Sequence, residues 1–199
     1  MKEDLIKYFE EKDSIREKAL KLSREIVREI AMSIRHIHKL KKDNDISFDD
    51  IADKLINLNE LIQQHSDLRK YINTPQQEFV EALVFYEIIK NNRIMEYSEF
   101  KEISLLPENY VLGLCDVIGE LRRMVLESIK NDDIENAKKY YEFMEKIYDF
   151  IMKFDYYHVI DGLRRKQDIS RSLLEKTNGD LVNFIENLKL RNEIKKLYK

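Results

Sequence analysis

Four acidic residues have the type and the spacing that metal-ion chemistry needs. Glu78 and Glu81 are three positions apart and Asp116 and Glu120 are four apart, so each pair shares one face of a helix. Both pairs stand in mainly apolar segments, where an unpaired carboxylate is costly to bury. Carboxylate oxygens are the ligands that Mg²⁺ and Mn²⁺ prefer. The pattern predicts a divalent cation that could activate a water for attack on a phosphodiester.

Two glycines draw attention to the second acid pair. Gly113 and Gly119 lie within the apolar segment that contains Asp116 and Glu120, and a glycine inside a helix costs about 1 kcal/mol relative to alanine. Gly113 shares a face with both acids, so we expect it to leave room for metal and substrate. Gly119 lies off that face, and we expect it to permit close helix packing.

Acid pairs of this kind also arise without a function. The chain has 38 acidic residues among 199, so many pairs at these spacings are solvated helix faces, and spacing does not show that the two pairs face each other. A ferritin-like di-metal bundle would need Glu-x-x-His on two helices. The chain has no Glu-x-x-His, and the nearest match is Asp155-x-x-His158. The sequence therefore argues against that class.

The composition predicts an all-α fold. Hydrophobic residues make up 43% and charged residues 37%, with two prolines and four glycines, and so few breakers cannot punctuate a β-sandwich or barrel. We expect one domain over residues 1–199, a bundle of about seven helices. The net charge of −3 gives no global basic field, and a lone cysteine, Cys115, excludes a disulfide framework. No apolar run is long enough to cross a membrane, so we expect a soluble, cytoplasmic protein.

Periodicity and capping signals place the helices. An apolar stripe from Ile15 to Leu40 predicts a long first helix, and a capping pattern at Ser47 predicts a second helix that ends near residue 71. Thr74 and Pro75 together predict the start of a third helix, which continues to about residue 91. Further helices are expected over residues 107–131, from residues 132–133, over roughly 156–176, and from residue 180 onward.

Four segments, taken in order, resemble a known family. They are residues 21–26 (Lys-Leu-Ser-Arg-Glu-Ile), 77–82 (Gln-Glu-Phe-Val-Glu-Ala), 110–121 (Tyr-Val-Leu-Gly-Leu-Cys-Asp-Val-Ile-Gly-Glu-Leu) and 131–134 (Asn-Asp-Asp-Ile). Together the chain resembles the translin superfamily over nearly its whole length, and it is more similar to translin-associated factor X than to translin. It is compact, as archaeal members are.

The resemblance implies a fold, an assembly and an activity. Members of the family are all-α and form hollow octamers that bind single-stranded nucleic acid. Factor X members are metal-dependent endoribonucleases, whereas translin subunits lack the acidic set and bind without cutting. The catalytic acids of the family would fall on Glu78, Glu81, Asp116 and Glu120. A chain without a translin-like partner would assemble with itself.

Single-stranded RNA requires cations for its phosphates, and three clusters could supply them. The first cluster lies over residues 35–42, the second directly follows Glu120, and the third begins at residue 164. The RNA-binding candidates from these clusters are Arg35, His38, Arg122, Arg123, Arg164 and Arg165. Lys41 and Lys42 extend the first cluster. Cations near the end of a helix also suit its dipole, and Arg122 and Arg123 could instead pair with acids such as Glu127.

The leading hypothesis is an endoribonuclease that uses Mg²⁺ or Mn²⁺ to cut single-stranded RNA inside a homo-octamer. The second is a non-catalytic protein that binds single-stranded RNA or DNA. A third is a helical scaffold that only assembles with partners.

Overall fold

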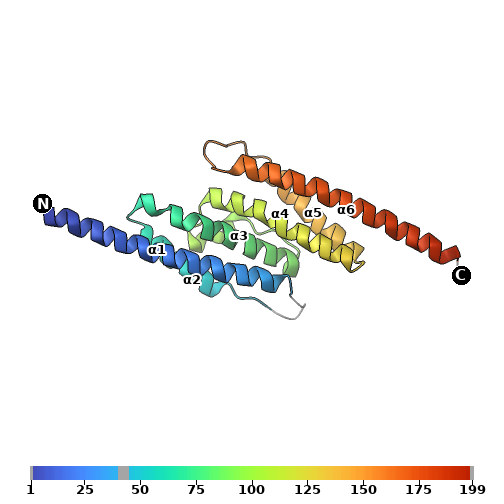
Figure 1. Cartoon of the computed structure of the whole chain (residues 1–199), viewed down its shortest axis with the longest axis horizontal. Coiled ribbons are helices and arrows are strands. Elements are labelled where there is room, and N and C mark those ends of the chain that lie inside the picture. Colours follow the sequence, from blue (N-terminus) through green and yellow to red (C-terminus); the bar gives the residue numbers. More distant parts are fainter. Residues whose placement is uncertain (1, 40–44, 198–199) are drawn as a thin grey trace. The chain divides into compact units, whose positions relative to one another are not determined.

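Helices account for all the regular secondary structure in the part of the chain that the structure describes, residues 2–39 and 45–197. In these ranges the computed structural model has six α-helices and two 3-10 helices, so the predicted all-α fold is confirmed. In chain order they are α1 (Lys2–Ile37), α2 (Asp49–Ile62), η1 (Ser66–Leu68), α3 (Lys70–Asn91), η2 (Tyr97–Ile103), α4 (Pro107–Lys130), α5 (Ile134–Ile151) and α6 (Leu163–Leu197) (Figure 1).

The contacts between residues divide the chain into two compact units, residues 1–113 and 114–199. The boundary falls inside α4, so the first two turns of this helix belong to the first unit and the rest to the second. Whether the two units form the single domain predicted over residues 1–199 depends on how they associate, so that domain assignment stays a prediction. None of the helices in the described ranges combines the length and the apolar character that crossing a membrane requires.

In the first unit, α1 packs along both α2 and α3 (Figure 1). The predicted apolar stripe forms the buried face of α1 as far as Ile37, because side chains three and four positions apart point to the same side of a helix; Leu40 lies outside the described residues. The buried side chains from the three helices include Ala19, Ile26, Ile30, Ile34, Ile37, Ile51, Leu55, Leu58, Ile62, Phe79, Val80, Val84, Phe85 and Ile88. This core holds α3, the helix that carries the first acid pair.

In the second unit, α5 packs along α6 (Figure 1). The buried positions of α6 alternate in steps of four and three, as in a coiled-coil seam. They are Leu163, Gln167, Ser170, Leu174, Thr177, Leu181 and Phe184. The regular seam keeps one face of α6 buried from its first turn through residue 184.

Two predicted boundaries in the first unit were wrong. The second helix ends at Ile62 rather than near residue 71, and α3 begins at Lys70, one turn before Thr74 and Pro75. η1 leads directly into α3, and Ile72 is buried in the added first turn. Burial of this side chain outweighs the loss of the backbone hydrogen bond that Pro75 cannot donate. The Ser47 hydroxyl accepts a hydrogen bond from the backbone amide of Asp49.

A third boundary was wrong in the second unit. The predicted stop at residues 178–179 lies inside α6, which runs without a break through Gly179 and Asp180. The buried seam continues in phase across this point, from Leu174 and Thr177 to Leu181. Burying these side chains outweighs the cost of one exposed glycine, about 1 kcal/mol. The start of α6 likewise falls at Leu163 rather than near residue 156.

Candidate functional site

The first acid pair lies on α3 beside a very close helix contact. Glu78 and Glu81 are both half-buried, and their neighbours Gln77 and Val80 touch the backbone of Gly113 at the second turn of α4. A Cβ atom on Gly113 would lie 2.7 Å from the Gln77 carbonyl oxygen and 2.8 Å from the Val80 Cβ. These distances are shorter than carbon and oxygen atoms tolerate, so only glycine allows this approach. The acids of α3 therefore flank the seam where α3 meets α4.

The expected roles of both glycines were wrong. Gly113 permits close packing of α4 on α3, while a Cβ on Gly119 would meet no atom within 4 Å. The error has a simple cause, because sequence spacing gives the face of a helix but not the element that covers this face. Gly113 therefore positions the helix rather than leaving space for a ligand.

Buried amides reinforce the same contact. Gln76 and Asn109 are almost wholly buried, and the Asn109 Nδ2 donates to the Gln76 Oε1 at 2.9 Å. The same oxygen accepts from the backbone amide of Leu106 at 3.0 Å, and the Gln77 Nε2 donates to the Asn109 Oδ1 at 3.2 Å. A buried polar network of this kind, once its groups are paired, fixes one arrangement of the helices. It ties the start of α4 to the turn of α3 that carries Glu78.

The second acid pair lies on α4 and is held by a cation from another helix. The Lys166 ammonium in the first turn of α6 donates to the Asp116 carboxylate in a short ion pair. Burial raises the pKa of Asp116 above its ordinary value, and the charge and hydrogen bond of Lys166 oppose that rise. Glu120, one turn later on the same face, is half-buried. The pair is thus a partly desolvated carboxylate group that already attracts positive charge.

Cys115 takes no part in such chemistry. Its side chain is buried next to Asp116, and burial raises the pKa of the thiol to about 12. A thiol with so high a pKa is neutral at physiological pH and packs as a small apolar group.

Arg122 is engaged within the protein. Its guanidinium donates to the Thr177 hydroxyl at 2.6 Å and to the Asp180 carboxylate at 3.0 Å, both on α6. It therefore ties the middle of α4 to the middle of α6, and the sequence interpretation that it could pair with an acid is correct, although the partner is Asp180 rather than Glu127. Its selection as an RNA contact stays a prediction.

The other cationic candidates lie at the surface. Arg123, Arg164 and Arg165 are exposed, and the Arg164 guanidinium lies 5.4 Å from the centre of the Tyr157 ring. The first turn of α6 carries these two arginines and Lys166 but no acid. Cations at this end of a helix add to the positive end of its dipole, so the turn is a site of concentrated positive potential.

The cluster near the end of α1 is only partly described. Arg35 is exposed, and the His38 ring is half-buried with its centre 4.9 Å from that of buried Phe85. Lys41 and Lys42 lie outside the described residues. Arg35 is thus accessible, whereas His38 is partly committed to the aromatic packing of the first unit.

The donor set suits a hard divalent cation. Each pair offers two carboxylates on one helix face, and the partly buried Asp116 is already paired with a cation. Within the described residues, neither unit by itself contains a group of three or more His, Cys, Asp or Glu side chains placed to hold a metal ion.

Sequence reasoning missed two parts of this arrangement. Lys166 is not among the predicted site residues, although its place beside two arginines at the positive end of a helix could have suggested an acidic partner. Gln76 and Asn109 gave no signal, since buried amides cannot be told from surface amides by sequence. Both features depend on which helices are neighbours.

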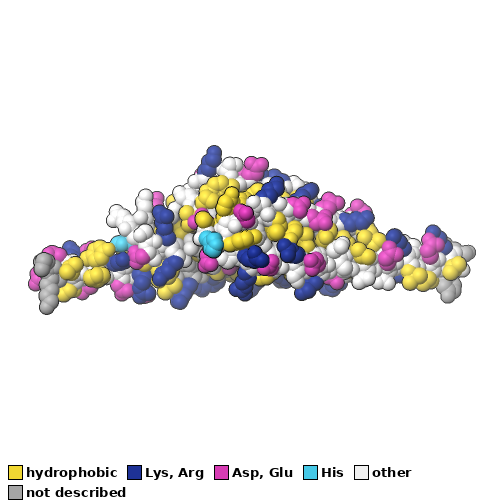
Figure 2. Space-filling model, turned by 90° about the horizontal axis from the view of Figure 1, so that it is seen from above, with side chains coloured by type: hydrophobic (Ala, Val, Ile, Leu, Met, Phe, Trp, Pro, Cys, Tyr) yellow, Lys and Arg dark blue, Asp and Glu magenta, His cyan; other side chains and the backbone are white. Residues whose placement is uncertain are grey.

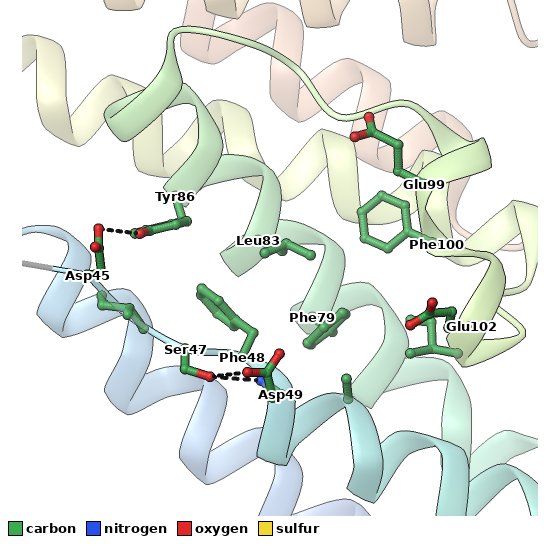
Figure 3. Close-up of a pocket in the computed structure, with 13 residues that line it drawn as sticks. Asp45, Ser47, Phe48, Asp49, Phe79, Leu83, Tyr86, Glu99, Phe100 and Glu102 are labelled. Atoms are coloured by element: carbon green, nitrogen blue, oxygen red, sulfur yellow. Dashed lines mark hydrogen bonds between the residues drawn. The ribbon is translucent and has the colours of Figure 1, made fainter.

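A separate pocket of about 440 Å³ lies in the first unit between α2, α3 and η2 (Figure 3). Its floor is aromatic, and carboxylates stand at its rim; it includes Asp45, Phe48, Asp49, Phe79, Tyr86, Glu99, Phe100 and Glu102. Asp45 pairs with Lys90 at 2.8 Å, and Glu99 pairs with Arg93 at 2.6 Å. An acidic rim does not suit a nucleic-acid phosphate, so we do not assign this pocket to RNA.

Comparison with known proteins identifies relatives over most of the chain. The model of the translin family matches residues 14–179. An uncharacterized protein of Methanocaldococcus jannaschii is 53% identical over 97% of this chain and 86% of its own length. Translin-associated protein X of Pongo abelii is 23% identical over 67% of this chain. The match covers 60% of the length of that protein.

Two solved structures share the fold. Apo-NeC3PO superposes with a TM-score of 0.80 at 22% identity and covers 92% of this chain and 96% of its own. A complex of AfC3PO with duplex RNA has a TM-score of 0.69 at 28% identity, over 94% of this chain and 98% of its own.

Proposed function

The chain belongs to the translin family, and we propose that it is a metal-dependent endoribonuclease that cuts single-stranded RNA inside a hollow homo-octamer. The family membership and the likeness to translin-associated protein X support nucleic-acid binding and point to the factor X branch. The cutting activity, the metal and the subunit number are the content of the proposal.

The register of α4 is the observation that carries the proposal. Gly113 presses the second turn of α4 onto α3 between Gln77 and Val80, the neighbours of Glu78 and Glu81. α4 is one continuous helix, and Asp116 and Glu120 follow Gly113 on the same face. We propose that all four acids serve the metal-dependent activity, as the resemblance to factor X members implies.

The chemistry follows from the donor set. A bound Mg²⁺ or Mn²⁺ would polarise the phosphodiester and lower the pKa of a bound water. Glu78, Glu81, Asp116 and Glu120 would hold the cation or position the attacking water, since all four offer hard oxygen atoms in partly buried surroundings. The close backbone contact at Gly113 and the buried amides would keep the α3 carboxylates from moving during the reaction.

The cationic surface supports RNA as the substrate. The related AfC3PO has been solved with duplex RNA, and by this relationship we extend RNA binding to the present chain. Arg164 and Arg165 lie at the positive end of α6, where phosphate groups are attracted by side chains and helix dipole together. Exposed Arg35 and Arg123 would add contacts along a flexible strand.

Exposed apolar side chains support assembly with further copies. On the first turns of α1, Leu5, Ile6, Tyr8 and Phe9 are all exposed, and yellow side chains mark this surface in Figure 2. On α6 the exposed apolar side chains are Val182, Leu190, Ile194 and Leu197. Such surfaces on a protein rich in charge are typical of interfaces. Native mass spectrometry should give the mass of eight chains; a monomer would overturn the proposed shell.

Cleavage assays test the activity directly. The protein is incubated with labelled single-stranded RNA and, separately, with duplex RNA, in Mg²⁺ and in EDTA. We expect Mg²⁺-dependent cutting of the single strand that is lost in Glu81→Gln and in Asp116→Asn, with RNA binding retained. Glu127→Gln, an exposed acid on the same helix as Asp116, is the matched control and should cut normally.

The assay also separates the two functions. RNA binding without cutting under any metal would favour a non-catalytic binding protein. Cutting that survives both substitutions would show that the acids are not the site.

A further inference from the structure

Lys166 stands in a place that helix stability does not explain. It lies in the first turn of α6 with Arg164 and Arg165, where a positive charge is unfavourable to the helix dipole. Its side chain is only 25% exposed, unlike those of the two arginines, which lie at the surface. A lysine that is partly buried at the wrong end of a helix needs a compensating partner.

That partner is Asp116, one of the four acids of the proposed metal site. The Lys166 ammonium and the Asp116 carboxylate form a short ion pair between α6 and α4. By contrast, Lys189–Glu186 and Lys196–Glu193 are pairs of neighbours on α6 whose side chains are about two-thirds exposed. Exposed pairs of that kind contribute little, whereas the Lys166–Asp116 pair joins two helices.

The surrounding packing fixes both partners. Gln167, next to Lys166, is buried and donates to the backbone carbonyls of Ile151 at 2.9 Å and Phe154 at 2.8 Å. Two turns after Asp116, Arg122 ties α4 to Thr177 and Asp180 of α6. The ammonium is therefore presented to the carboxylate by held helices and not by a free surface side chain.

We propose that Lys166 is the positioning residue of the metal site, whose ammonium holds the Asp116 carboxylate in place before metal binds and is exchanged for the metal ion. This inference rests on the proposed function, because it takes Asp116 as a metal ligand. A cation and an ammonium that approach the same carboxylate repel each other, so binding of the metal must break the ion pair. Lys166 thus sets the affinity for metal without contacting the reacting atoms.

The test measures metal affinity rather than cleavage. Binding of Mn²⁺ alone is followed by electron paramagnetic resonance in the wild-type protein, Lys166→Met, Lys166→Arg and Lys176→Met. Without the competing ammonium, Lys166→Met should bind Mn²⁺ roughly threefold to tenfold more tightly, the effect of one partly buried ion pair. Lys166→Arg keeps the charge and should bind like the wild type. Lys176→Met removes an exposed lysine of the same helix and is the matched control.

A second readout covers a variant that folds poorly. Lys166→Met leaves Asp116 without this partner, so its melting temperature should be lower without metal and should rise more than that of the wild type when Mn²⁺ is added. If it does not fold, Lys166→Gln, which keeps a hydrogen-bond donor but no charge, replaces it with the same expectations.

The outcomes are distinguishable. Equal or weaker Mn²⁺ affinity in the charge-free variants, with binding retained in the wild type, overturns the role of Lys166 alone. Absence of Mn²⁺ binding in the wild type overturns the metal site itself and the inference with it.

Discussion

The two acid pairs are held in the protein by different means. On α3, Glu78 and Glu81 sit beside a backbone contact at Gly113 and a network of buried amides, so packing fixes them. On α4, Asp116 is fixed by the charge of Lys166 from α6. Packing positions a carboxylate without neutralising it, whereas an ion pair positions it and can be exchanged for another cation. The α3 pair is therefore the rigid half of the proposed acid set, and the α4 pair is its exchangeable half.

The largest expected effect comes from removing one acid of each half. Glu81→Gln and Asp116→Asn should each lower the rate of RNA cleavage by about 100-fold or more, since each removes a group that acts on the reacting centre. If the halves share one site, the double variant should cut scarcely more slowly than the worse single variant. Single-turnover cleavage rates measure this, and independent, multiplicative losses would mean two separate roles.

The rigid half can be broken at Gly113. Gly113→Ala should lower the free energy of unfolding by about 2 kcal/mol, because the added methyl group would press on a backbone oxygen and a stiff valine. This loss exceeds the gain of about 1 kcal/mol in helix propensity. Urea unfolding followed by circular dichroism measures the change, and an unchanged midpoint would show that α3 and α4 separate easily.

The matched substitution at Gly119 should act in the opposite direction. A methyl group there meets no atom within 4 Å, so Gly119→Ala should raise the free energy of unfolding by up to about 1 kcal/mol. The same urea experiment serves. A loss of stability would indicate that a further copy of the chain packs on this face, which comparison of the melting temperature at several protein concentrations would reveal.

The exchangeable half should appear in the pH dependence of stability. Because the pKa of Asp116 is raised by burial in the folded protein, its favourable contribution is complete at low pH and is lost as pH rises through the folded pKa. Asp116→Asn does not titrate, so its stability relative to the wild type should increase between about pH 3 and neutral pH. Thermal melts across this range measure the difference, and a trend of opposite sign would mean that Lys166 dominates the pKa.

Several features followed from the sequence alone. The scarcity of glycine and proline predicted the all-α fold, and the apolar stripe of α1 predicted its buried face, because helix periodicity is a local property. Helix periodicity also predicts that Glu78 and Glu81 share one face of a helix, and that Asp116 and Glu120 share another.

Tertiary packing decided the rest. Local signals at Pro75 and Gly179 predicted helix boundaries, but burial of Ile72 and of the α6 seam outweighed them. Which glycine carries a helix contact and which lysine meets Asp116 depend on the elements that come to lie opposite α4. Sequence spacing fixes the side of a helix on which a residue stands, and only the packed structure supplies its neighbour.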